Sequence, residues 1–251
     1  MCYSVKSSLE TQLFHAKQDG DNKSVLELTK KLKTLITQPS FHLSAFTHPM
    51  VLVYTSSKVI ACYWGLIPSF VKSRKNIASI WQKTLNARLE TILKKPSFKE
   101  SALEKRCVVY VDGFYEFHHF KGKSYPFFVY RKDKKPMILA ALRSEWFDEK
   151  TNQNINTFCI VTNKAKDLMA KLHNNPKLKE ARTPLILNEY ESEFWLKEKS
   201  LNAENISVLK QINNEAHLTA HTVQKLSGKN YLGNVKKVSD EYCYKELIFE
   251  I

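Results

Sequence analysis

The stretch Arg106-Cys107-Val108-Val109-Tyr110-Val111-Asp112-Gly113-Phe114-Tyr115-Glu116-Phe117 determines the fold that we predict for this chain. β-Branched and aromatic residues dominate it, and a second run of this kind follows at Tyr125 to Tyr130. Such runs, separated by a short polar segment, are typical of antiparallel strands. We therefore expect Cys107 to Phe117 and Tyr125 to Tyr130 to form a β-hairpin joined around His119 to Lys123.

Similar short runs predict strands on both sides of this hairpin. Val51 to Tyr54 and Val59 to Trp64 flank a polar turn and form a second predicted hairpin. Met137 to Leu142, Thr157 to Thr162 and Pro184 to Leu187 are expected to be three further strands. Short connections favour antiparallel pairing, because parallel neighbours need long crossovers.

Apolar residues at intervals of three and four predict helices elsewhere. A helical hairpin is expected at about 8–37, and residues 86–101 read as helical or irregular. Three more helices are predicted at 163–173, 191–199 and 206–213. Strands and helices do not alternate as βαβ units, and no linker divides the chain. We expect residues 1–251 to form a single α+β domain with a curved, mainly antiparallel, barrel-like β-sheet flanked by helices.

Charge is the first indication of a partner. The 251 residues carry 39 Lys and Arg against 25 Asp and Glu, a formal net charge of +14. This excess favours a polyanion, nucleic acid ahead of a membrane surface. No run approaches the ~20 apolar residues of a membrane span, and no apolar segment precedes Cys2. We expect a cytoplasmic protein.

Common cofactor and metal motifs are missing from the sequence. The five cysteines form no C-x-x-C pair, which argues against disulfides and structural zinc. Gly228 and Gly233 have the spacing of a phosphate loop, but Asn234-Val235 follows where Lys and Ser or Thr are needed. His118 and His119 would point to opposite faces of a strand. The sequence therefore predicts neither a cofactor nor a metal.

Cys2 has special chemistry if Met1 is removed, because the chain then begins with a 1,2-aminothiol. The α-amine has a reference pKa of about 8, against about 10.4 for lysine, so far more of it is neutral at pH 7. A neutral amine forms an imine with an aldehyde, and the adjacent thiol can close a thiazolidine ring. By position alone, the favoured interpretation of Cys2 is an ordinary residue on a frayed terminus.

Five blocks, in order, resemble the SRAP family of abasic-site-processing proteins, also called SOS-response-associated peptidases. They run over nearly the whole chain: Met1-Cys2; Trp64-Gly65-Leu66-Ile67-Pro68; Asn86-Ala87-Arg88-Leu89-Glu90-Thr91; Arg106-Cys107 with Asp112-Gly113-Phe114-Tyr115-Glu116-Phe117; and Thr162, Ala165, His173 and Arg182-Thr183-Pro184-Leu185-Ile186-Leu187. The chain departs from the family pattern at Tyr3-Ser4, where Gly-Arg is usual, and in the longer segment 174–181.

The resemblance implies a DNA-damage protein that binds single-stranded DNA and is associated with the nucleoid at damaged DNA. In this family the N-terminal cysteine forms a covalent thiazolidine link to the ring-opened aldehyde of an abasic site, without a cofactor. The expected partner is single-stranded DNA with abasic sites, and the expected state is a monomer that does not bind membranes.

The resemblance also implies roles for ten residues. Cys2 supplies amine and thiol, Glu116 moves protons, and His173 assists proton transfer at the sugar oxygen. Asn86 orients Cys2 or the deoxyribose. The implied DNA contacts are Arg88 on a phosphate; Trp64, Leu66 and Pro68 as an apolar wedge for base stacking; and Thr162 and Arg182 on further phosphates.

Three alternatives stay open at this point. An N-terminal-cysteine amidohydrolase or amidotransferase would also begin with Cys2 and use its α-amine as a base. A self-processing peptidase would act on Met1 alone. A non-catalytic binder of single-stranded DNA would leave Cys2 without a chemical role.

Overall fold

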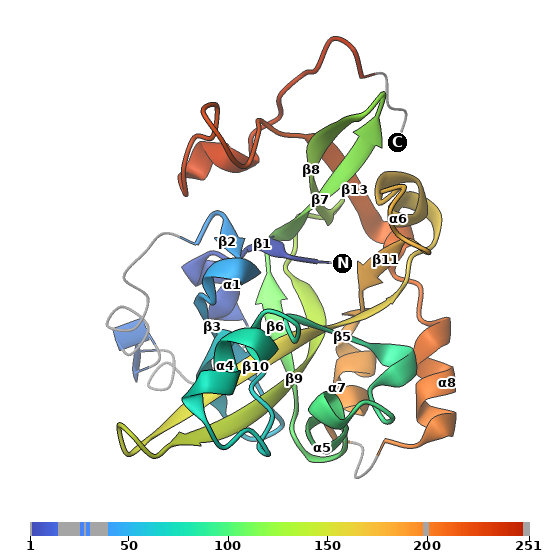
Figure 1. Ribbon diagram of the computed structural model, residues 1–251. Helices are drawn as coiled ribbons and strands as arrows, with labels where there is room; N and C mark the ends of the chain where they lie inside the picture. The colour runs from blue at the N-terminus through green and yellow to red at the C-terminus, as the bar shows by residue number, and fades with distance from the viewer. Residues whose placement is uncertain (1, 15–25, 28, 31–39, 198–200, 248–251) are drawn as a thin grey trace.

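Two β-sheets, with helices around the larger one, make up the protein (Figure 1). The computed structural model describes residues 2–14, 26–27, 29–30, 40–197 and 201–247. The strands are β1 (Ser4–Lys6), β2 (Leu43–Ser44), β3 (Met50–Tyr54), β4 (Val59–Trp64), β5 (Asn86–Arg88), β6 (Arg106–Val111), β7 (Gly113–Phe120), β8 (Lys123–Arg131), β9 (Met137–Asp148), β10 (Gln153–Lys164), β11 (Arg182–Pro184), β12 (Ile186–Leu187) and β13 (Leu218–Thr222).

Six α-helices and four short 3-10 helices connect these strands in the described part of the chain. The α-helices are α1 (Leu9–Gln12), α4 (Arg74–Trp81), α5 (Pro96–Glu104), α6 (Asp167–Leu172), α7 (Glu189–Lys197) and α8 (Ala203–Gln211). The 3-10 helices are η1 (Ala45–Thr47), η2 (Leu89–Thr91), η3 (Glu215–His217) and η4 (Lys236–Ser239).

The larger sheet closes on itself. Its order is β11-β10-β4-β3-β6-β9-β12, and β9 also pairs with β10 along eight residue pairs. The strands β10, β4, β3, β6 and β9 therefore form a ring, with β5 added beside β10. Only the pairings of β10 with β4 and with β5 are parallel. The predicted α+β class, with a mainly antiparallel, barrel-like sheet and flanking helices, is confirmed.

Alternation along each barrel strand divides the core into an inner and an outer layer, because successive side chains of a strand point to opposite faces. In β6, Cys107 and Val109 belong to the inner cluster, whereas Val108 and Tyr110 belong to the outer one. The outer cluster also contains Trp195 of α7 and side chains of α5 and α8. These helices therefore cover apolar strand faces that water would otherwise reach.

The smaller sheet, of order β13-β8-β7-β1-β2, lies above the barrel in Figure 1. Strands β7 and β8 form the predicted hairpin, and its turn places Lys121 and Gly122 at φ values of 46° and 75°. Both residues are in the left-handed region, as a two-residue hairpin turn requires. Strand β1 pairs with β7 and brings the N-terminal segment into the middle of the molecule.

The quoted stretch is not one strand, contrary to our prediction. It divides at Asp112 into β6, which belongs to the barrel, and β7, which belongs to the smaller sheet. Asp112 N donates to Lys6 O (2.8 Å). The backbone therefore leaves the barrel sheet at the point where β7 begins to pair with β1 in the smaller sheet. Gly113 follows because a Cβ there would lie 2.4 Å from the Phe128 ring.

Several predicted boundaries also differ. Strand β10 includes Asn163 and Lys164, which we predicted to be helical, so α6 begins only at Asp167. The predicted strand 184–187 is two short strands, β11 and β12. The described part of the 8–37 segment includes α1, and most of the remaining predicted helical hairpin lies outside the described residues. Helix α4 and strands β1 and β13 were not predicted.

Asp112 also anchors the segment that carries Cys2. Its carboxylate accepts hydrogen bonds from Ser8 N (2.6 Å), Ser8 Oγ (3.0 Å) and Thr11 Oγ1 (2.7 Å). Ser8 is the N-cap of α1, so one carboxylate holds the helix start and the end of β1 against the β6–β7 corner. Hydrogen bonds to an ionised acceptor are stronger than those between neutral groups.

We predict that Asp112→Ala lowers the free energy of unfolding by about 2–3 kcal/mol, because three donors lose a charged acceptor. Urea denaturation followed by circular dichroism measures this change. Asp240→Ala is the control, since this exposed carboxylate makes no side-chain hydrogen bond to the described residues. This substitution should change the free energy of unfolding by less than about 0.5 kcal/mol. Equal effects of both substitutions would contradict the anchoring role.

Candidate active site around Cys2

Cys2 lies inside the protein, at the junction of the barrel and the smaller sheet. Its side chain is fully buried and belongs to the inner core cluster. Ser4 pairs with Tyr115 and Val5 with Phe114, so continuing this register places Tyr3 beside Glu116. The pairing of β1 with β7 therefore brings the Cys2 segment close to Glu116, the predicted proton carrier.

Asn86 holds the backbone of Cys2. Its Nδ2 donates to Cys2 O at 2.8 Å. Strand β5 sets this position, because Asn86 pairs with Ile160 of β10. The other amide atom, Oδ1, is buried and accepts no hydrogen bond from a described residue. This oxygen is available to a donor group near the N-terminus.

Glu116 is a buried carboxyl group on β7, with 5% of its surface exposed. Its Oε1 accepts a hydrogen bond from Phe117 N (3.1 Å), and its Oε2 lies 3.5 Å from His173 Nδ1. Burial raises the pKa of Glu116, because the charged form loses hydration. A raised pKa makes a carboxyl group a better proton donor than an ordinary glutamic acid while its carboxylate becomes a better acceptor.

His173 follows the last residue of α6 and is also buried. Burial lowers its pKa to about 4, so the ring is neutral at pH 7. Its Nδ1 lies 2.8 Å from the carbonyl oxygen of Arg182, which can only accept a hydrogen bond, and 3.3 Å from Arg182 N, which can only donate one. The shorter contact is the stronger one and requires a proton on Nδ1. We therefore assign the proton of the neutral ring to Nδ1, which leaves a lone pair on Nε2.

The Cys2 thiol is held in its protonated form. Burial raises its pKa strongly, and the negative charge of Glu116 raises it further. A thiol with this pKa is not a free nucleophile at neutral pH. It reacts only when a neighbouring base accepts its proton, and Glu116 is a carboxylate electrostatically coupled to it.

An open pocket of about 390 Å³ adjoins these groups. Glu116 and His173 form part of its wall, and the remaining wall residues are Tyr3, Phe117, His119, Ser124, Asn175 and Leu178. Sequence reasoning assigned no site role to these six. Two of them had a signal, because Tyr3 follows Cys2 and Phe117 follows Glu116 at the end of a motif block. The other four lie outside the motif blocks.

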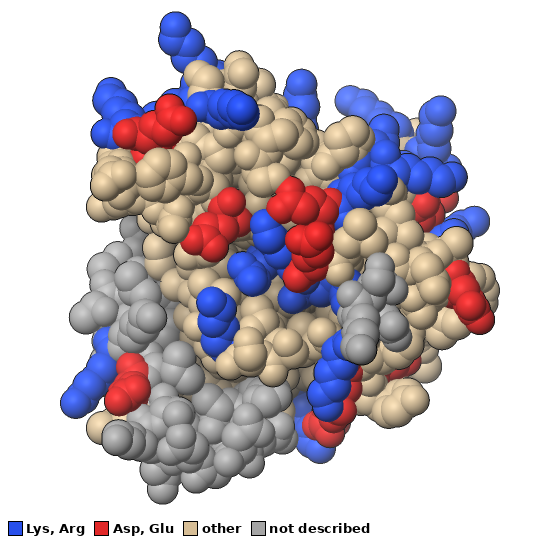
Figure 2. Space-filling model, turned by 90° about the horizontal axis from the view of Figure 1, so that it is seen from below, with Lys and Arg blue, Asp and Glu red and all other residues tan. Residues whose placement is uncertain are grey.

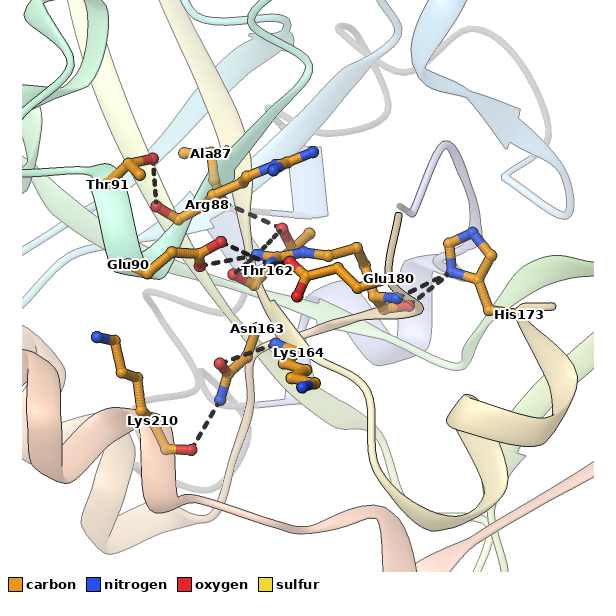
Figure 3. A network of polar contacts seen from close by, with 11 residues as sticks. Ala87, Arg88, Glu90, Thr91, Thr162, Asn163, Lys164, His173, Glu180 and Lys210 are labelled. Carbon is orange, nitrogen blue, oxygen red and sulfur yellow. Dashed lines mark hydrogen bonds and ion pairs between the residues drawn. The ribbon is translucent and has the colours of Figure 1, made fainter. Parts of the chain in front are cut away.

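Arg182 is at the centre of a buried polar network, shown in Figure 3. Its guanidinium group forms ion pairs with Glu90 (2.6 Å) and Glu180 (2.8 Å) and donates to the carbonyl oxygen (2.9 Å) and Oγ1 (3.2 Å) of Thr162. Thr162 is fully buried and Arg182 is 2% exposed. Protein groups cover both residues and leave them almost no exposed surface, and their contact with phosphate stays a prediction. In this structure they support β5 and the His173 ring.

The three residues of the predicted stacking wedge are all buried in this structure. Trp64 and Leu66 have no exposed surface, and Pro68 is buried. Trp64 Nε1 donates to Leu85 O (2.9 Å), and its ring stacks on Phe158 at 5.8 Å between centroids. Protein groups therefore cover the Trp64 ring here, and base stacking on this wedge stays a prediction.

Arg88 remains available for a ligand. The residue is exposed at the end of β5, and its guanidinium group forms no ion pair with a described residue. Figure 3 shows its side chain extending away from the network formed by Arg182, Glu90 and Glu180. A free, exposed guanidinium two residues from Asn86 suits a phosphate next to the site.

Lys and Arg side chains project around the rim of the face shown in Figure 2, and both charge signs meet near its centre. In the part of the chain that the structure describes, no helix has the length and apolar character to cross a membrane. Among the same residues, no group of three or more His, Cys, Asp or Glu side chains is arranged to hold a metal ion. Cys62, Cys107 and Cys159 are buried and free.

The fold and the Cys2 site together define an α+β protein whose candidate chemistry lies at its N-terminus. The profile described as SOS response associated peptidase (SRAP) matches residues 1–230, and the chain belongs to this family. A solved structure of a Bacteroides thetaiotaomicron protein superposes with a TM-score of 0.81 and 29% identity, covering 96% of this chain and all of that one.

Two relatives identified by sequence have names that describe a function. The abasic site processing protein YoqW of Bacillus subtilis is 31% identical over 164 residues, which cover 65% of this chain and 68% of YoqW. The abasic site processing protein HMCES of Gallus gallus is 31% identical over 153 residues, 53% of this chain and 43% of HMCES.

The neutral, buried His173 predicts a pH dependence of stability. Because its pKa falls from 6.5 to about 4 on folding, the unfolded chain binds a proton between these values and the folded chain does not. This group therefore makes stability fall as the pH drops from 6.5 to 4, by at most about 3 kcal/mol. The raised pKa of Glu116 has the opposite effect. Above the ordinary pKa of a glutamate, it makes stability rise as the pH drops.

Comparing wild type with His173→Gln isolates this contribution, since the loss of stability on acidification should be smaller in the variant. Urea denaturation at a series of pH values between 4 and 7 gives the slopes. His42→Gln should change the slope with the same sign, because burial also lowers the pKa of His42 to about 4. Parallel curves for wild type and His173→Gln would show that His173 does not carry the effect.

Proposed function

We propose that this protein binds single-stranded DNA and captures abasic sites in it through a covalent link to Cys2. The observation that carries the proposal is the convergence of Asn86, Glu116 and His173 on the Cys2 segment. Asn86 bonds to the Cys2 carbonyl, and Glu116 lies 3.5 Å from the His173 ring. The names of the relatives, abasic site processing proteins, support the same substrate.

The proposed reaction begins after removal of Met1. The α-amine of Cys2 adds to the aldehyde carbon of the ring-opened sugar, and loss of water gives an imine. The thiol sulfur then adds to the imine carbon while the thiol proton is transferred to nitrogen, which closes a five-membered thiazolidine. The product is the sum of protein and DNA less one water. Amine and thiol on neighbouring carbons make this closure intramolecular, with effective molarities of ~10⁵ M or more.

Glu116 and His173 divide the proton transfers in this proposal. The sugar must open before its aldehyde can react, which requires a proton at the ring oxygen and loss of one from the hydroxyl group. Glu116, with its raised pKa, supplies the first proton, and the lone pair on His173 Nε2 accepts the second. The Glu116 carboxylate then takes the proton of the Cys2 thiol and passes it to nitrogen.

Asn86 and Arg88 position the reactants. The unpaired Oδ1 of Asn86 would accept a hydrogen bond from the new α-amine or from a sugar hydroxyl group. Arg88 would bind the phosphate next to the lesion, since its planar guanidinium group pairs with two oxygens of an anion. Selectivity then comes from the aldehyde, and binding needs no base to be flipped out.

We predict that Cys2→Ala abolishes the covalent adduct with an oligonucleotide that carries one abasic site. Intact-mass spectrometry of the wild type should show protein without Met1 plus DNA less one water. Cys243→Ala is the matched control, because this free cysteine is exposed and its loss should leave the adduct unchanged. An adduct in Cys2→Ala, or full activity of protein that retains Met1, would falsify the mechanism.

We further predict that Glu116→Gln and Arg88→Ala separate chemistry from binding. Glu116→Gln should slow cross-linking about 10²-fold or more, since it removes the proton carrier, with little change in DNA affinity. Arg88→Ala should weaken affinity about tenfold and lower the salt dependence of binding by about one charge. Fluorescence anisotropy measures affinity, and quenched gel assays with saturating DNA measure the rate.

Arg131→Ala controls for the loss of one positive charge. Arg131 ends β8 at the opposite end from Ser124 of the pocket, where it pairs with Asp133. DNA affinity should change far less in this variant than in Arg88→Ala. If rate and affinity fell together in both site variants, the assigned division of roles would be incorrect.

A further inference from the structure

The pocket beside Glu116 and His173 extends beyond the groups that the proposed reaction uses. Its volume, about 390 Å³, is within the range of small-molecule sites, which is ~300–1,000 Å³. Glu116 and His173 form one part of the wall, whereas Phe117, His119 and Ser124 come from the β7–β8 hairpin. The lesion itself lacks a base, so this additional volume is open to another part of the strand.

The segment between His173 and Arg182 forms a fixed wall of this pocket. The side-chain amide of Asn174 accepts from His119 N (2.7 Å) and donates to His119 O (2.9 Å). Asn174 thus pairs with the β7 backbone as a neighbouring strand would. Asn175 and Leu178, which follow this clamp, line the pocket, and Leu178 N donates to Asn175 O (3.0 Å).

The lining combines aromatic surface with several polar atoms that make no hydrogen bond within the described part of the chain. Phe117 is 36% exposed, and Tyr3 lies on the same wall. His119 Nδ1 is buried and has no hydrogen-bond partner among the described residues. The Ser124 hydroxyl group and the Asn175 amide nitrogen also make no hydrogen bond to described residues. A buried polar atom without a partner is costly, so the right ligand would carry complementary groups.

We propose that this pocket receives the base of one nucleotide next to the abasic site, and that the rate of capture therefore depends on that base. The inference rests on the proposed function, because it places the strand by its lesion at Cys2. A nucleobase is a planar ring that stacks on aromatic side chains and presents donors and acceptors at its edge. Phe117 offers aromatic surface and His119 offers a polar group. Both line the same pocket as Glu116, which the proposed reaction places beside the lesion.

The test compares oligonucleotides with one abasic site, in which one neighbour is A, C, G, T or a spacer without a base. Single-turnover cross-linking at subsaturating protein gives the rate constant for each. At one of the two neighbours, removal of the base should slow capture about tenfold, as expected for loss of base stacking. The four bases should differ there by about threefold or more, since edge contacts distinguish them.

His119→Ala and Asn174→Ala test the pocket itself. The readout is the ratio of rates with a base-bearing and a base-free neighbour, measured in one protein sample, so a partly unfolded variant lowers both rates alike. Each substitution should reduce this ratio about threefold or more, because the first removes a polar partner of the base and the second releases the wall. His217→Ala, an exposed histidine on η3, should keep the wild-type ratio.

The outcomes separate this inference from the function on which it rests. Adduct formation at the same rate for every base and for the spacer, at both neighbours, would overturn the base pocket and leave the covalent capture intact. An unchanged ratio in His119→Ala and in Asn174→Ala would overturn it as well. Absence of an adduct with every oligonucleotide would refute the proposed function, and the pocket assignment with it.

Discussion

The antiparallel pairing of β1 with β7 is the interaction on which the candidate site depends. Three residue pairs, from Ser4 with Tyr115 to Lys6 with Gly113, bring the start of the chain against the strand that carries Glu116. The Asp112 carboxylate holds the end of this short strand through Ser8 and Thr11. Without the pairing, an N-terminal cysteine would be an ordinary frayed terminus, because so short a segment cannot order itself.

Burial then shifts the pKa values of three groups at the site. It raises the pKa of the Cys2 thiol and of Glu116 and lowers that of His173, so all three favour their neutral forms. Each shift lowers the cost of burying these groups, because burial penalises the charged form. The guanidinium charge of Arg182, by contrast, is balanced by Glu90 and Glu180.

Much of the fold could be read from local patterns, and the errors have identifiable causes. Runs such as Val59 to Trp64 have high β-propensity and a clear turn before them, and β4 matches that prediction. The break at Asp112 could not be predicted, because Val111 and Phe114 look alike as strand residues while their partners belong to different sheets. Strand β1 is three residues long, too short for a periodic pattern, and forms only because β7 and β2 lie on either side of it.

The sequence by itself determined the family, the α+β class and the residue types that can perform aldehyde chemistry, because motif order and side-chain chemistry are properties of the chain. Only the tertiary structure decided which motif residues face the site. Trp64 and Arg182 both belong to motif blocks. Closure of the barrel nevertheless buries Trp64, and two carboxylates form ion pairs with Arg182. Burial depends on contacts between distant segments, such as Asn174 with His119 and Asn86 with Cys2, and no local pattern encodes such contacts.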